Sequence, residues 1–335
     1  MNREKDTQSH WLPEPTPAAD VGYDTRGFDC LVAVIRRIYH LVADDLDGTK
    51  AFAEAQEKNL ILRYACGVPD LSDVATPDLV ASSVAEKKKI MTKLFGNDPR
   101  ASINFHDLCC SDLMNETFWR LRPFHLFRPR LENFEGSSPP WRWIDWDPRE
   151  ITAMNLIRME GSQNPASTLQ DFVNGTFGRR TWRGREVLLA SNCPTVVRVL
   201  YTPGPDRVDS FQELRSFNMP YYNFENGWQV SGQGHMRYSL VAVVHMVHPD
   251  VVAFQDSVRL YGLDGSQLVP RSSNPAFTDY SWSLDQFTDS SYMLFFGKAD
   301  EVQLEPGFPE VTPVKTPVTG NELIMDVLKS YRDSR

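Results

Sequence analysis

The chain has 335 residues, of which 41% are hydrophobic and 24% charged, which is enough apolar material for one large domain or two ordinary ones. Its formal net charge of −9 argues against non-specific nucleic-acid binding, which needs a basic surface. The polar N-terminus lacks the apolar core of a signal peptide, and the longest apolar run, 240–247, is too short to span a bilayer. We therefore expect an intracellular protein, cytoplasmic or nuclear, with no membrane partner.

The cysteines are scattered and odd in number, and no Cys-x-x-Cys pair occurs among them: Cys30, Cys66, Cys109, Cys110 and Cys193. This pattern supports neither a disulfide framework nor a structural zinc site. We therefore expect reduced thiols, no metal and no cofactor.

The first third of the chain is predicted to be helical. Residues 1–20 hold three prolines and little apolar periodicity, so we expect a disordered arm there. Apolar residues then recur at steps of three and four from Leu31 to Val42, the spacing of one buried helix face. Further helices are predicted over 50–64, 76–95 and 103–120, and the Lys87–Lys89 run is interpreted as a solvated helix face.

Cys30 falls at the first turn of the first predicted helix, after a glycine-containing turn. Unpaired N–H groups and the positive end of the helix dipole stabilise a thiolate at such a position. A cysteine nucleophile is one interpretation; a small buried core residue is the other.

The remainder of the chain is predicted to be mostly strands. Pro- and Gly-rich residues 123–140 indicate an irregular linker, and the tryptophans at 141, 143 and 146 suit a short strand or an aromatic loop, buried or stacking on a ligand. A capped short helix is expected at 167–177. Antiparallel strands are predicted over 185–190, 195–201, 238–246, 251–254, 258–263 and 292–296, followed by a linker at 306–317 and a terminal helix at 321–332.

A thiol nucleophile needs a histidine within hydrogen-bond reach and a third group that orients the histidine. His245 and His248 stand at the end of the strongest predicted strand, and Asp264 lies in a turn after a later strand. This spacing permits His248 and Asp264 to lie on neighbouring strands. The alternatives are a polar strand end for His248 and a turn former for Asp264.

Taken in order, these segments resemble the ubiquitin-specific proteases, the papain-like deubiquitinases. Gly27-Phe28-Asp29-Cys30 is similar to the Gly-x-x-Cys box of that family. The matching segments that follow are 168–172 (the Ser-Leu-x-Asp-Leu helix), 193–200 (the Leu-Pro-x-Val-Leu strand), 238–245 (the strand before the histidine box), 263–270 (the Phe-Asp-Asp-Ser turn) and 291–296 (the closing strand). The resemblance covers roughly residues 21–298.

The resemblance implies an α+β, papain-like fold of ubiquitin-specific-protease type over 21–300, with a helical thumb (21–122) packed on an antiparallel β palm with fingers (123–300), and a linker and terminal helix over 301–335. It implies Cys30 as nucleophile, His248 as general base and Asp264 as the orienting group. Thr25, Asp29 and the N–H groups at the helix start would form the oxyanion region. The implied activity is removal of ubiquitin, or a ubiquitin-like modifier, from proteins. The implied partner is ubiquitin or a ubiquitinated protein, and membership of a larger protein complex stays open.

Several positions depart from the family pattern. The usual oxyanion Asn is replaced by Thr25, which is shorter, and Pro249 follows His248 where the family has tyrosine. The loop after His245 is short, so a shifted alignment would put Asp250 at the catalytic position. The cysteine pairs that bind zinc in the fingers are absent. An alternative function is therefore a catalytically weak or inactive module that binds ubiquitin or another protein as a scaffold.

Overall fold

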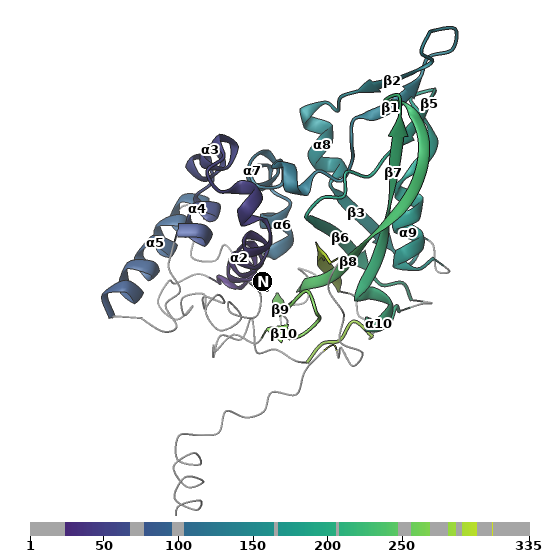
Figure 1. The fold of residues 1–335 in the computed structure, drawn as a ribbon. Helices are drawn as coiled ribbons and strands as arrows, with labels where there is room; N and C mark the ends of the chain where they lie inside the picture. The colour runs from purple at the N-terminus through teal and green to yellow at the C-terminus, as the bar shows by residue number, and fades with distance from the viewer. Residues whose placement is uncertain are drawn as a thin grey trace, which may run out of the picture.

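A helical lobe lies against a large β-sheet, and a smaller sheet extends the molecule on the far side of the large one (Figure 1). This computed structural model describes residues 24–67, 77–95, 104–163, 167–205, 208–246, 256–268, 281–285, 290–299 and 310. The mixed α+β class expected from the sequence is confirmed. The expected arm at 1–20, the strand at 251–254 and the terminal helix at 321–332 lie outside the described residues.

In the described residues, the helical lobe is built from six helices and one short connecting turn. They are α2 (Arg26–Leu46), α3 (Lys50–Lys58), α4 (Leu60–Gly67), α5 (Pro77–Phe95), α6 (Phe105–Cys109) and α7 (Asp112–Glu116), with a 3₁₀ turn η2 at Arg122–Phe124. Two helices predicted as continuous are broken by capping side chains. The side-chain oxygen Oδ1 of Asn59 accepts from the N–H groups of Ile61 and Leu62, which ends α3 and starts α4. The Ser111 hydroxyl accepts from Met114 N in the same way and starts α7.

The central sheet has the strand order β10-β9-β8-β11-β6-β3, with β7 also paired to β8. Its strands are β3 (Leu156–Glu160), β6 (Val196–Thr202), β7 (Ser216–Glu225), β8 (Gln229–Met246), β9 (Ser257–Tyr261), β10 (Gln267–Leu268) and β11 (Ser291–Lys298). The expected antiparallel arrangement holds for every pair except β3 and β6, which run parallel. The sheet is therefore mixed, with one parallel pair among antiparallel ones.

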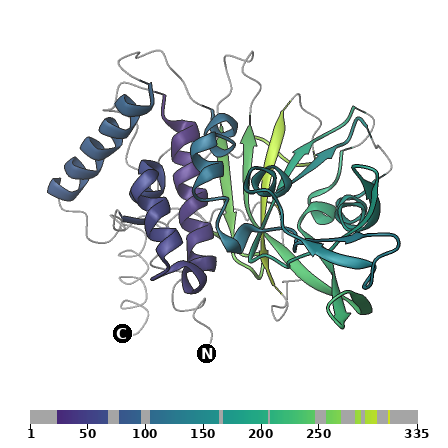
Figure 2. The same ribbon diagram turned by 90° about the horizontal axis from the view of Figure 1, so that it is seen from above.

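The central sheet separates two hydrophobic cores. Met293 and Phe295 of β11 face the helical lobe, whereas Leu294 and Phe296 face the opposite core, as the period of two in a strand requires. The β8–β11 register shifts between Phe295 and Phe296, and the bulge lets Val241 and its neighbour Ala242 both face the helices. The helical lobe covers one of these two faces (Figure 2).

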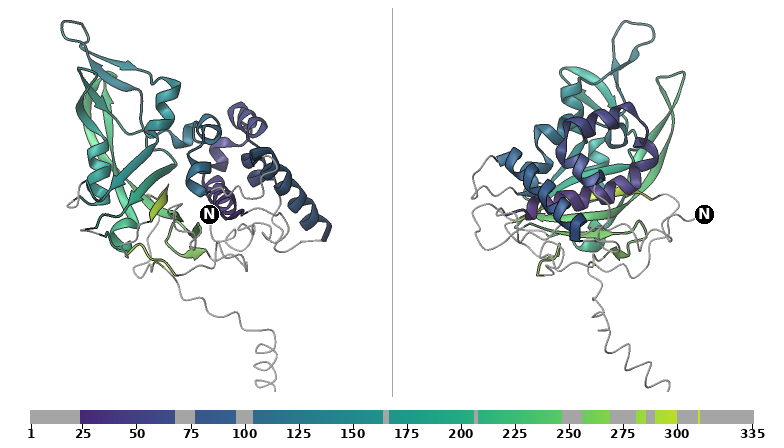
Figure 3. Two further views of the ribbon diagram at one scale, coloured as in Figure 1. Left: turned by 180° about the vertical axis from the view of Figure 1, so that it is seen from behind. Right: turned by 90° about the vertical axis from the view of Figure 1, so that its left-hand side faces the viewer.

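The smaller sheet has the order β2-β1-β5-β4. It is formed by β1 (Arg130–Asn133), β2 (Trp141–Ile144), β4 (Gly178–Trp182) and β5 (Arg185–Leu189), with α8 (Pro148–Met154), α9 (Leu169–Thr176) and α10 (Phe211–Leu214) on the same side of the molecule. Helix α9 begins with the expected capping box between Thr168 and Asp171. The long β7–β8 hairpin reaches from the central sheet to the smaller one, as Figure 3 shows from two sides.

No helix in the described ranges is long and apolar enough to cross a membrane.

Candidate functional site

The start of α2 determines the surroundings of Cys30. The first intrahelical hydrogen bond runs from Asp29 N to Thr25 O at 2.8 Å, so the helix begins one turn earlier than the sequence suggested. The unpaired N–H groups of a helix belong to its first turn. Cys30, the fifth helical residue, therefore lies beyond the N–H groups that were expected to stabilise its thiolate and to form an oxyanion hole.

The thiol of Cys30 is fully buried in the core between the helices and the sheet. Burial raises the pKa of this thiol well above its usual range, and the carboxylates of Asp256 and Asp29 raise the pKa further. Arg26 acts in the opposite direction but does not outweigh them. Among the described groups that act on this pKa, none is a histidine. The thiol is therefore held neutral, the opposite of the protonation state that nucleophilic attack requires.

Thr25 and Asp29, the expected oxyanion residues, belong to a buried ionic cluster. Lys87 Nζ lies 2.7 and 3.0 Å from the two carboxylate oxygens of Asp29, and Thr25 Oγ1 donates to Asp29 Oδ2 at 3.0 Å. Lys87 is fully buried, and the other two side chains are 1% exposed. The interpretation of the lysine run as a solvated face is therefore wrong for Lys87. Its ammonium group neutralises Asp29 and ties α5 to the first turn of α2.

Strand β9 runs along α2, and this direction determines which residue of the β9 segment lies near Cys30. Asp256, directly before β9, acts electrostatically on the Cys30 thiol. Five residues on, the Tyr261 carbonyl accepts from Arg37 Nε at 2.9 Å. The strand thus follows the helix axis away from Cys30. The acidic residue that acts on the Cys30 thiol therefore lies directly before this strand, and its carboxylate accepts a hydrogen bond from Phe105 N of α6.

Asp264 lies near the other end of α2. A Cβ atom built on Gly297 would lie 2.9 Å from Leu263 and 3.0 Å from Leu41, so the residue before Asp264 sits close to Leu41. Leu41 is eleven residues beyond Cys30, about 16 Å along a helix that rises 1.5 Å per residue. The structure therefore does not bring Asp264 to Cys30. Its carboxylate instead accepts from Ser266 N at 3.0 Å and Ser266 Oγ at 2.7 Å, the arrangement of a turn former.

The two candidate histidines differ in what the structure says of them. His248 lies outside the described residues, and its role as general base stays a prediction. His245, opposite Ser257 in the β8–β9 pair, is 5% exposed. Its ring stacks on Trp282 at a centroid distance of 5.2 Å and tilts against Tyr292 at the same distance. His245 therefore belongs to the aromatic core on the face of the sheet that the helical lobe does not cover.

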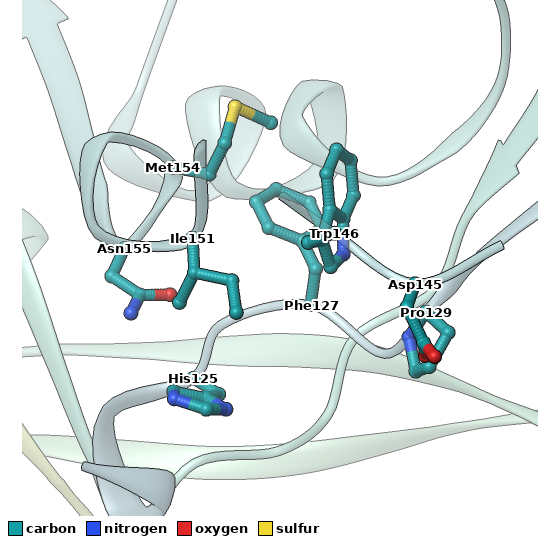
Figure 4. Close-up of a pocket in the computed structure, with 8 residues that line it drawn as sticks. All are labelled: His125, Phe127, Pro129, Asp145, Trp146, Ile151, Met154 and Asn155. Atoms are coloured by element: carbon teal, nitrogen blue, oxygen red, sulfur yellow. The ribbon is translucent and has the colours of Figure 1, made fainter. Parts of the chain in front are cut away.

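A pocket of about 300 Å³ lies between α8 and the segment after η2 (Figure 4). It is lined by His125, Phe127, Pro129, Asp145, Trp146, Ile151, Met154 and Asn155. The lining is mostly apolar, and His125 Nε2 lies 2.7 Å from the Arg120 carbonyl oxygen. Neither Cys30 nor its charged neighbours line it, so this pocket is separate from the candidate catalytic residues.

Asp256 is the residue of this region that the sequence did not indicate. A pairing of β9 with β8 in the observed register, Ala242 opposite Leu260, brings Asp256 to the sheet end near α6. The apolar run at 258–263 predicted this strand, but the sequence does not contain its register. Among the described residues, no three His, Cys, Asp or Glu side chains gather to hold a metal ion.

Comparison with known proteins adds no assignment: no family model matches the chain, and no curated protein matches it. The residues and their geometry therefore carry the functional argument.

Proposed function

We propose that this chain is a domain of ubiquitin-specific-protease type that binds ubiquitin or a ubiquitin-like modifier as a recognition module, without thiol catalysis at Cys30. The burial of the Cys30 thiol is the observation that argues against catalysis by this residue. The thiol is fully buried, and its pKa is raised by burial and by two carboxylates.

The order and packing of the elements support the family assignment. The segments that resemble family motifs are α2, α9, β6, β8 and β11, and the last three are neighbours in the central sheet. Helix α2 packs on that sheet through its apolar face. In the family that these segments resemble, a helix packed on a sheet in this way receives the C-terminal tail of ubiquitin at the start of the helix. We therefore favour recognition of ubiquitin as the function.

The electrostatics of the site argue against thiolate chemistry. Attack on an isopeptide carbonyl requires a thiolate, and an anion forming at Cys30 would meet the negative charges of Asp256 and Asp29 without contact with water. A carboxylate also cannot donate a hydrogen bond to an oxyanion. The buried Lys87 does not supply the missing positive charge, because it is already paired with Asp29 at 2.7 Å.

A surface suited to protein binding lies at the end of the β7–β8 hairpin, and we call it the hairpin-tip surface. It consists of Trp143, Phe224, Gly227 and Val230. Trp143 packs edge-on against Phe224 with centroids 4.9 Å apart and donates from Nε1 to the Gly227 carbonyl. Trp143 and Val230 are the exposed large hydrophobic residues of the described chain, at 36% and 38%.

Two arginines lie beside aromatic rings of this region. The guanidinium of Arg128 lies 5.8 Å from the Phe224 ring centroid, and that of Arg179 lies 5.3 Å from the ring centroid of Trp141, which is on β2 with Trp143. Tryptophan and arginine are the residue types most enriched where protein interfaces are strongest. The hairpin-tip surface is therefore the part of the molecule that we expect a bound modifier to contact.

Titration of isotope-labelled ubiquitin with this chain, followed by NMR, tests the binding proposal. We expect shifts of ubiquitin resonances on addition of the wild type, and at least tenfold weaker binding for Trp143→Ala. Lys50→Ala, an exposed change on the helical lobe, serves as the control and should bind like wild type. Absence of any shift at millimolar protein, or equal binding by Trp143→Ala, would overturn the proposal.

Isopeptidase activity is the second candidate, favoured by the weak start of α2. Thr25 stands at the N-cap position, but its side chain makes no capping hydrogen bond, and Gly27 lies in the first turn. Unwinding of this turn would free N–H groups next to Cys30. Hydrolysis would then need His248 to approach from outside the described residues, and cleavage of a ubiquitin conjugate that is lost in Cys30→Ala would support it.

A further inference from the structure

A second cysteine site lies at the end of α6, away from the start of α2. Cys109 closes α6, and Cys110 follows at the C-cap, where its N–H donates to the His106 carbonyl at 2.9 Å. Because His106 and Cys110 are four residues apart at the end of this helix, their side chains lie on one face, and the imidazole acts on the Cys110 thiol. Cys109 is fully buried, whereas Cys110 is partly exposed beside the half-exposed His106.

A buried arginine completes the cluster from the central sheet. Arg198, in the middle of β6, is 2% exposed, and its guanidinium lies 4.2 Å from the Trp119 ring centroid. Trp119 Nε1 donates to the Cys109 carbonyl at 2.7 Å, so this ring links the guanidinium to the end of α6. The Nε atom of Arg198 has no hydrogen-bond partner among the described residues. A buried cation from the sheet and a half-exposed imidazole from α6 thus both belong to the surroundings of the two cysteines.

This arrangement favours a thiolate at Cys110. The hydrogen bond from Cys109, the bond from His106 and the charges of His106 and Arg198 all lower the pKa of Cys110 against the effect of burial. The same contact raises the pKa of His106, and Asp107, 3.5 Å from His106 Nδ1, adds to that. Burial raises the pKa of Cys66, a comparable partly exposed thiol, to about 12. The pKa values of Cys110 and Cys66 are therefore shifted in opposite directions within one chain.

We propose that Cys110, backed by His106, Cys109 and Arg198, is a peroxide-reactive modification site that hydrogen peroxide oxidises to a sulfenic acid. The Cys110 sulfur attacks one peroxide oxygen, so that an S–O bond forms while the O–O bond breaks. The departing hydroxide takes a proton from the His106 imidazolium and leaves as water. The sulfur is oxidised by two electrons and the peroxide is reduced by two. His106 is the general acid of this step and returns neutral.

The test treats the full chain with hydrogen peroxide and traps sulfenic acid with dimedone, with the modified cysteines located by mass spectrometry. We expect Cys110 to be labelled at least tenfold faster than Cys66. The rate at Cys110 should change little between about pH 6 and 8, because its thiolate is already formed, whereas an ordinary thiol gains about tenfold per pH unit below its pKa. His106→Asn should slow labelling of Cys110 at least tenfold and leave Cys66 unchanged.

The control for folding is Cys109, which stays unlabelled while the fold is intact because it is fully buried. Equal labelling of Cys110 and Cys66, a rate at Cys110 that climbs tenfold per pH unit over the same range, or an unchanged rate in a folded His106→Asn variant would each overturn the proposal.

Discussion

Replacement of Lys87 by methionine tests the buried ionic cluster at the start of α2. Methionine keeps the length and much of the volume of the side chain, so packing beside the Phe28 ring, 5.9 Å from the lysine nitrogen, is largely retained. The change removes the ammonium group from the buried Asp29 carboxylate and leaves the hydrogen bond from the Thr25 hydroxyl in place. A cluster that ties α5 to α2 should then lose stability because one charge is uncompensated.

The expected loss is large for a single residue. At about 3 Å and an effective dielectric constant of about 20, the attraction between the two charges is about 5 kcal/mol. Removing one partner of a buried pair costs about 3–5 kcal/mol of unfolding free energy. We expect a loss in this range for Lys87→Met. The double variant Asp29→Asn/Lys87→Met should recover part of it, because no buried charge remains.

Urea denaturation followed by circular dichroism measures these differences from the midpoint and slope of each curve. Lys88→Met is the matched control, because the neighbouring lysine is exposed, and its effect should stay within about 0.5 kcal/mol. A loss below about 1 kcal/mol for Lys87→Met would refute the reasoning. So would a double variant whose loss equals the sum of the two single losses, because the two charges would then not be coupled.

Three further predictions concern the core and the caps. Cys30 should resist alkylation by iodoacetamide in the folded chain and react in denaturant, since its thiol is fully buried and its pKa is raised; mass spectrometry of labelled peptides checks this, and fast native labelling would contradict it. Gly297→Ala should cost about 1–3 kcal/mol of unfolding free energy, because its Cβ would lie 2.9–3.2 Å from three side chains; an effect near zero would mean that they give way freely. Thr168→Ala should cost about 1 kcal/mol in the same urea assay by removing one half of the capping box, and an unchanged midpoint would count against that role.

Local signals in the sequence predicted several elements well. The helix expected at 76–95 begins with proline, the residue suited to a first helical position, and is observed as α5. The capped helix at 167–177 is observed as α9, and the aromatic and apolar run at 292–296 is observed within β11. In each of these the deciding interactions lie within a few residues, so the pattern along the chain contains them.

Long-range contacts determine what the sequence did not predict. Lys87 is buried because Asp29 of another helix pairs with it, and no pattern within α5 indicates such a partner. Strand β3 was not predicted, and its parallel pairing with β6 depends on a chain crossing. The carboxylate of Asp256, which the sequence did not indicate, acts on the Cys30 thiol because the register of β9 determines which residue lies near the start of α2.

Ubiquitin with a cysteine-reactive group at its C-terminus tests the central claim, that this domain recognises ubiquitin without using Cys30 as a nucleophile. A Cys110→Ser background removes the thiol that we expect to react without recognition, and mass spectrometry locates any adduct. We predict that the variant binds the probe reversibly and that Cys30 carries no adduct. An adduct on Cys30 that forms with the ubiquitin probe, but not with the reactive group alone, would contradict the account and indicate a thiol isopeptidase.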